Sequence, residues 1–243
     1  MITNALTIDV EDYYQVSAFA RNVAYDDWDR HESRVERNTA RILDIFSEAG
    51  VKATFFVLGW VASRHPGIVR DIAARGHEIA CHGYSHKLIY DQSPVDFRNE
   101  TLSSKRLLED QAQCDVLGYR AASYSITSKS LWALDILHEC GFVYDSSIFP
   151  IRHDRYGIPD ADMEPHVHTT QSGASIVEFP VTALDMKIAT LPLGGGGYFR
   201  LFPYWLTRAG LKLVNTRTRS PFIFYLHPWE LDVEQPRLEG SWF

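Results

Sequence analysis

Short apolar runs alternate with amphipathic stretches along most of this chain. Where apolar residues recur with helical spacing, as at Val35, Leu43 and Phe46, the pattern predicts a helix. Uninterrupted apolar runs bounded by polar or turn residues predict buried strands. The predicted strands lie at residues 5–10, 53–58, 78–80, 119–121, 143–145, 176–181 and 222–226.

Capping signals indicate the ends of the predicted helices. Ser33 and Glu36 match the pattern of a capping box, so we expect a helix to begin there and to stop at Gly50. Ser93 followed by Pro94 is typical of another helix start. Further helices are expected between residues 66 and 76 and over residues 130–141.

The order of these elements predicts the fold. Strands and helices alternate regularly from residue 5 to residue 145, which indicates a parallel sheet of the α/β class. We expect a (β/α) barrel that is distorted or incomplete, formed by a single domain over residues 1–243. The regular alternation of strands and helices is absent from residues 150–200, where we expect an insertion or lid. Within it, consecutive glycines at 194–197 predict a flexible loop, because no phosphate-binding motif is complete.

Composition restricts the partners of the protein. The 243 residues are 45% hydrophobic, which is enough for a full core. The chain has 24 Lys+Arg against 31 Asp+Glu and a net charge of −7, without a basic stripe, so nucleic acid is not expected as a partner. Residues 1–20 lack a secretion signal and no run of about 18 apolar residues occurs, which predicts a cytoplasmic protein without a membrane span. The oligomeric state is left open.

Two histidines four positions apart are the first indication of chemistry. His82 and His86 would share one face of a helix, where two imidazole nitrogens can converge on one metal ion. A further ligand is available at the end of the first predicted strand, where Asp9, Glu11 and Asp12 bring carboxylates together. Like charges packed this closely favour a bound cation. The sequence therefore predicts a metal site.

Several polar residues directly follow a predicted strand. In a (β/α) barrel the carboxyl ends of the strands meet at one face, and that face carries the catalytic groups. We therefore expect these side chains to gather in one site: Asp9, Glu11, His82, Arg120, Asp145 and His227.

Five short segments resemble the motifs of the polysaccharide deacetylases, a family of metal-dependent carbohydrate esterases with a distorted (β/α) barrel. They occur in the family's order, at residues 7–12, 82–86, 119–124, 143–147 and 225–228. The sequence segments at residues 9–13, 145–150 and 227–231 are most similar to those of the subgroup associated with exosortase and exopolysaccharide loci. Two positions depart from the family pattern. Val10 stands where an aspartate is usually a metal ligand, and Ala122 stands where proline is usual.

The resemblance implies a set of metal ligands. Since Val10 cannot bind a metal, the carboxylate ligand is Glu11 or Asp12. Alternation along an extended strand sends residues 9 and 11 to the same side, which favours Glu11. Together with His82 and His86 it would hold a divalent ion, in the first place Zn²⁺, although Co²⁺, Ni²⁺ and Mn²⁺ also suit such a site.

The resemblance also implies which groups move protons. Asp9 is expected to be the base, oriented by Arg120, and His227 the acid that protonates the leaving amine. Asp145 is expected to hold the His227 ring, and the backbone N–H near Tyr124 to stabilise the oxyanion. Aromatic residues near the motifs are expected to stack on sugar rings: Tyr13, Tyr14, Tyr124 and Trp229.

These roles predict a metal-dependent N-deacetylase that acts on N-acetylhexosamine units of a polysaccharide, and on an exopolysaccharide by the subgroup resemblance. Two alternatives stay open. An allantoinase-like hydrolase of small ureides shares the fold and similar motifs, and would have a closed pocket in place of an open groove. A catalytically silent carbohydrate-binding protein could use the same barrel, although it would not need base, ligands and acid together.

Overall fold

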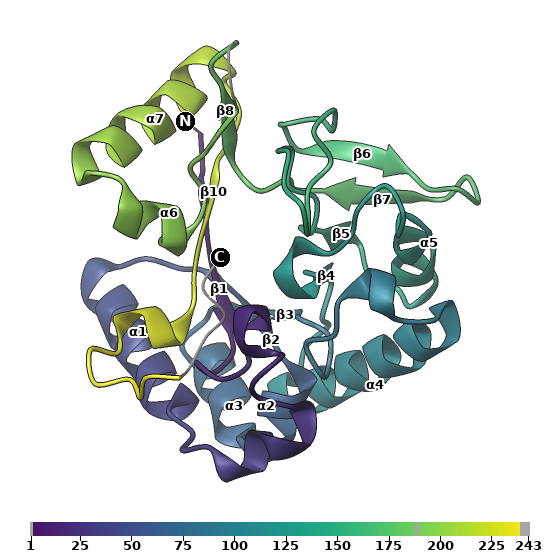
Figure 1. Ribbon diagram of the computed structural model, residues 1–243, viewed down its shortest axis with the longest axis vertical. Coiled ribbons are helices and arrows are strands. Elements are labelled where there is room, and N and C mark those ends of the chain that lie inside the picture. The colour runs from purple at the N-terminus through teal and green to yellow at the C-terminus, as the bar shows by residue number, and fades with distance from the viewer. Residues whose placement is uncertain (1, 188–189, 239–243) are drawn as a thin grey trace.

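A computed structural model describes residues 2–187 and 190–238 of the chain. Its centre is an eight-stranded sheet that curls into a half-barrel, in the order β10-β1-β2-β3-β4-β5-β7-β6 (Figure 1). Neighbouring strands are parallel, except that β6 is antiparallel to β7. The predicted α/β class and incomplete barrel are therefore confirmed.

The strands of this sheet are β1 (Ala5–Val10), β2 (Thr54–Val57), β3 (Glu78–Cys81), β4 (Gly118–Tyr119), β5 (Tyr144–Asp145), β6 (His166–Thr169), β7 (Ser175–Glu178) and β10 (Ile223–Leu226). A separate hairpin pairs β8 (Ala183–Asp185) with β9 (Thr190–Pro192). The α-helices are α1 (Val35–Ala49), α2 (Gly59–Arg64), α3 (Pro66–Ala74), α4 (Pro94–Ala112), α5 (Trp132–Glu139), α6 (Gly196–Leu201) and α7 (Tyr204–Arg217). Short 3₁₀ helices include η1 (Ser17–Phe19), η2 (Tyr25–Arg30), η3 (Ile89–Asp91), η4 (Ala122–Tyr124) and η5 (Pro228–Leu231). Among the described residues, no helix combines the length and the apolar character needed to cross a bilayer.

The main hydrophobic core lies between the sheet and the helices that cover it (Figure 1). Strand residues such as Ile8, Phe55 and Ile79 are buried there. Apolar helix residues, including Ile42 of α1 and Val69 of α3, belong to the same cluster. The alternating strands and helices thus bury the apolar runs in the manner that the sequence predicts.

Helix α1 lies where the sequence predicts it, but its first turn is capped by a different contact. The N-cap residue is Arg34, and no side chain of the predicted capping box caps the helix. Instead, the Asp12 carboxylate accepts hydrogen bonds from the backbone N–H groups of Arg34 and Val35, at 2.7 and 3.1 Å. The Ser33 hydroxyl donates to the same oxygen at 3.0 Å. A carboxylate at a helix N-terminus satisfies unpaired N–H groups and interacts favourably with the helix dipole.

The chain from residue 150 to residue 220 holds more regular structure than the sequence indicates. Strand β7 extends the main sheet beside β5, and the β8–β9 hairpin precedes α6 and α7. The prediction of a flexible loop at the four glycines is wrong, since Gly196 and Gly197 begin α6. A Cβ atom at Gly196 would collide with the Glu230 carboxylate, so any larger residue there would displace that side chain. The expected insertion or lid over residues 150–200 stays a prediction.

The register of the parallel strands brings polar residues to one edge of the sheet. Asp9 on β1 and His227, directly after β10, are neighbours across these two strands. In the same way His82 follows β3 and Arg120 follows β4, and these strands pair with each other. Residues that are far apart in the sequence therefore meet where the strands end.

Candidate active site

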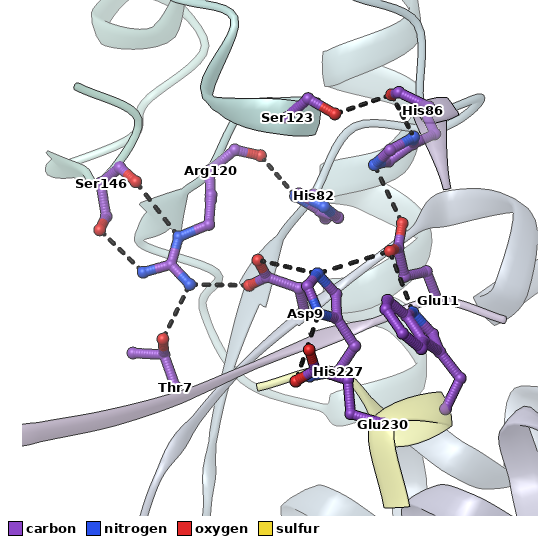
Figure 2. A network of polar contacts seen from close by, with 12 residues as sticks. Thr7, Asp9, Glu11, His82, His86, Arg120, Ser123, Ser146, His227 and Glu230 are labelled. Carbon is purple, nitrogen blue, oxygen red and sulfur yellow. Dashed lines mark hydrogen bonds and ion pairs between the residues drawn. The ribbon is translucent and has the colours of Figure 1, made fainter. Parts of the chain in front are cut away.

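Three side chains from two strand ends could hold a metal ion. The ligand atoms of Glu11, His82 and His86 all lie within 4.8 Å of one another, and Glu11 and His82 are buried. Glu11 directly follows β1, whereas both histidines lie in the loop after β3. Figure 2 shows the His86 ring pointing at the Glu11 carboxylate.

The two histidines do not share a helix face, and this part of the prediction is wrong. They lie in a loop in which Gly83 and His86 have left-handed backbone angles, with φ of 74° and 54°. The loop brings the two imidazole rings edge to face, with centroids 5.3 Å apart. Glycine adopts this conformation readily, whereas His86 needs surrounding contacts to stay in it.

Hydrogen bonds orient both imidazole rings. His82 Nδ1 lies 2.8 Å from the Arg120 carbonyl oxygen, which can only accept, so Nδ1 carries the proton and Nε2 keeps its lone pair. His86 Nδ1 lies 3.5 Å from the Ser17 hydroxyl, which bonds in turn to the Ser123 hydroxyl at 2.7 Å (Figure 2). Burial lowers the pKa of His82 to about 4, so this ring is neutral at pH 7, as a ligand must be.

Glu11 supplies the carboxylate of this group. Its Oε2 lies 2.9 Å from His86 Nε2, and its Oε1 accepts a hydrogen bond from the Trp229 indole at 3.3 Å. Burial acts to raise the pKa of Glu11, but the facing histidines, His86 above all, outweigh burial and lower the pKa to about 2. The carboxylate is therefore ionised at neutral pH.

The residues that follow Glu11 serve the fold. Asp12, the alternative metal ligand, uses its carboxylate to cap α1. Tyr13 and Tyr14 are 2% and 1% exposed, and Tyr14 packs edge to face against Trp28 and Trp60. The prediction that these two tyrosines stack on sugar rings is wrong, because their faces are covered. An aromatic residue beside a motif gives the same local pattern whether it lines a cleft or fills the core.

Asp9 and Arg120 form a buried ion pair. Arg120 Nη1 donates to Asp9 Oδ1 at 2.7 Å and to Thr7 Oγ1 at 2.8 Å, and both charged groups are almost completely buried. The other guanidinium nitrogens donate to Ser146, to its carbonyl oxygen at 3.2 Å and to its hydroxyl at 2.9 Å. One oxygen of Asp9 is thereby fixed, and the other faces His227 (Figure 2).

His227 faces both acidic residues at the end of β1. Its Nε2 lies 3.5 Å from Glu11 Oε1 and 4.0 Å from Asp9 Oδ2. Its Nδ1 lies 3.7 Å from Oε2 of Glu230, which forms an ion pair with Arg200 at 2.6 Å. Burial acts to lower the pKa of His227, but Glu230 and the other two carboxylates outweigh burial and raise it to about 9. The ring is therefore protonated at neutral pH and able to donate a proton.

The prediction that Asp145 holds the His227 ring is wrong. The Asp145 carboxylate accepts hydrogen bonds from the backbone N–H and the hydroxyl of Ser147, at 3.0 and 2.6 Å. Across the sheet it lies beside Glu178 of β7. The place expected for Asp145 is taken by Glu230, which the sequence analysis missed. Its position three residues after His227, in the turn that Pro228 begins, is a local signal that could have identified it.

Asp145 and Glu178 are buried beside each other, and both have raised pKa values. Both side chains are fully buried, and burial raises the pKa of each carboxyl group. The neighbouring Asp145 raises the pKa of Glu178 further, well above its ordinary value of 4.5. Ser147 donates twice to Asp145 and so favours the ionised form of that carboxyl group, whereas Glu178, with the more strongly raised pKa, is the one of the two that keeps its proton.

The stability of Glu178→Gln relative to the wild type is expected to increase as the pH rises above about 5. Above pH 4.5 the unfolded chain releases the Glu178 proton that the folded protein keeps, so wild-type stability falls with rising pH by up to about 1.4 kcal/mol per unit. Glutamine has nearly the same shape as glutamate and has no proton to release. Urea denaturation between about pH 5 and 8 should show a difference between variant and wild type that grows with pH. A difference independent of pH would contradict the raised pKa of Glu178.

Tyr124 and Trp229 both contact residues of the site. The backbone N–H of Tyr124 donates to the carbonyl oxygen of Ala121 at 3.1 Å, and the stabilisation of an oxyanion by a backbone N–H near Tyr124 stays a prediction. The Tyr124 ring is 6% exposed and packs against Tyr225, which leaves no open face for a sugar. Trp229 is partly buried, stacks on His227 with centroids 4.9 Å apart, and bonds to Glu11 as described above. Its stacking on a sugar ring stays a prediction.

Two family models divide the chain. Residues 21–144, just over half of the chain, match the polysaccharide deacetylase family, and residues 146–243 match a domain of unknown function (DUF3473). The chain belongs to the polysaccharide deacetylase family, as its motifs indicate.

Individual relatives match over shorter segments. A peptidoglycan-N-acetylglucosamine deacetylase of Bacillus cereus is 40% identical over 70 residues, which are 29% of this chain and 26% of the relative. A chitooligosaccharide deacetylase of Bradyrhizobium sp. is 29% identical over 99 residues, which are 41% of this chain and 43% of the relative. The chain thus spans less than half the length of these curated relatives. The crystal structure of a candidate polysaccharide deacetylase from Mycobacterium smegmatis shares the fold, with a TM-score of 0.67 and 24% identity over 94% of this chain and 78% of that one.

Proposed function

We propose that this protein removes N-acetyl groups from N-acetylhexosamine units of a polysaccharide by metal-dependent hydrolysis. The observation that carries the proposal is the convergence of a possible metal site, a buried carboxylate and a protonated histidine at one edge of the sheet. Hydrolysis of an acetamide needs a Lewis acid, a base and an acid in one place. Membership of the polysaccharide deacetylase family supports this assignment.

The group formed by Glu11, His82 and His86 fits a divalent cation. One ionised carboxylate and two imidazoles are a donor set that suits Zn²⁺, and also Co²⁺, Ni²⁺ or Mn²⁺. Glu11 Oε2 and His86 Nε2 lie 2.9 Å apart. That buried Oε2 has no hydrogen-bond donor aligned with it among the described residues. A cation held by Glu11, His82 and His86 would give this buried carboxylate oxygen a partner.

Asp9 and His227 have the positions of base and acid. A bound divalent ion would polarise the acetyl carbonyl and lower the pKa of the attacking water. Asp9 accepts the proton of that water through the oxygen that Arg120 leaves free, while Arg120 fixes the orientation of the carboxylate. His227 then donates its proton to the amine nitrogen as the C–N bond breaks. Glu230 stabilises the charged ring until that step.

The expected substrate is a polymer that contains N-acetylated hexosamine. The two curated relatives described above are named for peptidoglycan N-acetylglucosamine and for chitooligosaccharides, which both belong to this class. Similarity at residues 9–13 and 227–231 to a subgroup associated with exopolysaccharide loci favours an exopolysaccharide. The partly exposed Trp229 offers an aromatic surface beside the site.

Acetate release from N-acetylglucosamine oligomers by the Zn²⁺-reconstituted protein tests this proposal. We expect the wild type to release acetate and His82→Ala to release none above background, because one of three ligands is lost. His138→Ala, which changes an exposed histidine on α5, is the matched control and should retain full activity. Allantoin should not be hydrolysed.

The other outcomes would replace the proposal with a defined alternative. Turnover of allantoin without acetate release would indicate an allantoinase-like ureide hydrolase. Binding of Zn²⁺ and of N-acetylglucosamine oligomers without turnover of either substrate would indicate a catalytically silent carbohydrate-binding protein.

A further inference from the structure

The peptide group between Arg120 and Ala121 is hydrogen-bonded at both ends. Its carbonyl oxygen accepts from His82 Nδ1 at 2.8 Å, and its N–H donates to the Ser147 hydroxyl at 2.8 Å. Because a peptide unit is planar and trans, its C=O and N–H point in opposite directions. His82 and Ser147 therefore lie on opposite sides of one rigid group. A change in the hydrogen bond to Ser147 is expected to change the hydrogen bond to His82 as well.

The Ser147 hydroxyl continues this connection to Asp145. It accepts the hydrogen bond from Ala121 and donates its own proton to Asp145 Oδ1 at 2.6 Å. The Ser147 backbone N–H donates to Oδ2 of the same carboxylate at 3.0 Å. Asp145, Ser147 and Ala121 are all fully buried, so bulk water does not compete for these bonds.

We propose that Asp145 and Ser147 are positioning residues that orient and polarise His82 through the Arg120–Ala121 peptide group. The inference rests on the proposed function, in which His82 holds the metal. Metal-binding histidines are commonly supported by a carboxylate that accepts directly from the second ring nitrogen. Here the carboxylate acts through a hydroxyl and a peptide group.

The direction of the hydrogen bonds supports this role. Each donor in the series points toward Asp145: His82 Nδ1–H to the peptide carbonyl, the peptide N–H to Ser147, and the Ser147 hydroxyl to the carboxylate. Hydrogen bonds aligned in one direction polarise and strengthen one another. The negative charge on Asp145 therefore increases electron density at His82 Nε2, the atom that faces the metal position.

Ser146, next to Ser147, contacts the side chain of Arg120. It accepts two hydrogen bonds from the Arg120 side chain, as described above, and its hydroxyl donates to the Phe179 carbonyl oxygen at 2.9 Å. Residues 145–147 thus fix both the side chain of Arg120 and the peptide group that follows it. The motif at residues 143–147 therefore supports the histidine ligand His82, whereas the sequence predicted that its Asp145 contacts His227.

The affinity for Zn²⁺, measured by competition with a chromophoric chelator at fixed pH, tests the inference. Ser147→Ala removes the hydroxyl from the series and is expected to weaken Zn²⁺ binding by about tenfold. This is the lower end of the roughly 10- to 100-fold loss of affinity that follows when a residue supporting a metal ligand is removed. Ser130→Ala is the matched control. Ser130 is equally buried and bonds to Ser125 and Thr127, outside the series, so this variant should bind Zn²⁺ as the wild type does.

A second readout distinguishes positioning from general destabilisation. In the metal-free protein, the NMR resonance of the His82 Nδ1 proton should move upfield in Ser147→Ala and stay in place in Ser130→Ala, because only the first change weakens its hydrogen bond. If Ser147→Ala does not fold, Asp145→Asn replaces it, since that variant removes the charge and keeps the shape.

The outcomes separate this inference from the proposed function. A folded Ser147→Ala variant with wild-type Zn²⁺ affinity and an unmoved His82 proton would overturn the inference alone. Failure of the wild type itself to bind any of Zn²⁺, Co²⁺, Ni²⁺ and Mn²⁺ would overturn the proposed function, and the role in metal binding with it.

Discussion

Asp9→Asn is expected to lower the rate of acetate release by about 10²- to 10⁴-fold, the range in which a general base contributes. The asparagine amide cannot take a proton from water, although it has nearly the same shape as the carboxylate. Zn²⁺ binding should persist, because the possible metal ligands are Glu11, His82 and His86. Single-turnover assays at saturating Zn²⁺, with a parallel measurement of bound metal, check both parts of this result.

The control for this prediction must account for stability. Asp9→Asn leaves the buried Arg120 without its ion-pair partner, so the variant should unfold at a lower temperature than the wild type. Assays are therefore run well below the unfolding midpoint of the variant. Asp26→Asn, a change at an exposed aspartate in η2, should leave both activity and stability unchanged. Acetate release by Asp9→Asn at the wild-type rate would exclude Asp9 as the base.

Arg120→Met is expected to lower the free energy of unfolding by about 3–5 kcal/mol, which is typical when one partner of a buried ion pair is removed. Arg120 is fully buried, and its guanidinium donates to Asp9, Thr7 and Ser146. Methionine fills part of the volume but leaves the buried Asp9 charge without its guanidinium partner. Urea denaturation of the metal-free protein measures the effect.

Two further variants test the cause of this loss. Arg30→Met removes an exposed ion pair, in which the Arg30 side chain is 80% exposed, and should change stability by less than about 1 kcal/mol. The double variant Asp9→Asn with Arg120→Met removes both charges and should lose less stability than the sum of the two single variants. Additive losses would show that the ion pair itself contributes nothing.

The sequence alone could predict the fold class and the residues that gather at the site. Each predicted strand is a local apolar run, and alternation with helices restricts such runs to a parallel sheet. Parallel strands place their carboxyl ends at one edge, so Asp9, His82, Arg120 and His227 could be expected to meet there without knowledge of the strand order. The possible ligand Glu11 follows from alternation along β1, because neighbouring side chains of a strand point to opposite sides.

Only the tertiary structure decided which partner each buried polar group has. A carboxylate needs donors or a cation whether it caps a helix, holds a histidine or binds a metal, so Asp12 and Asp145 look alike in sequence. In the folded chain Asp12 caps the start of α1. Asp145 contacts Ser147 and lies beside Glu178, and the residue beside His227 is Glu230. Such contacts depend on which strands and loops approach one another in space, and no local pattern of residues encodes that.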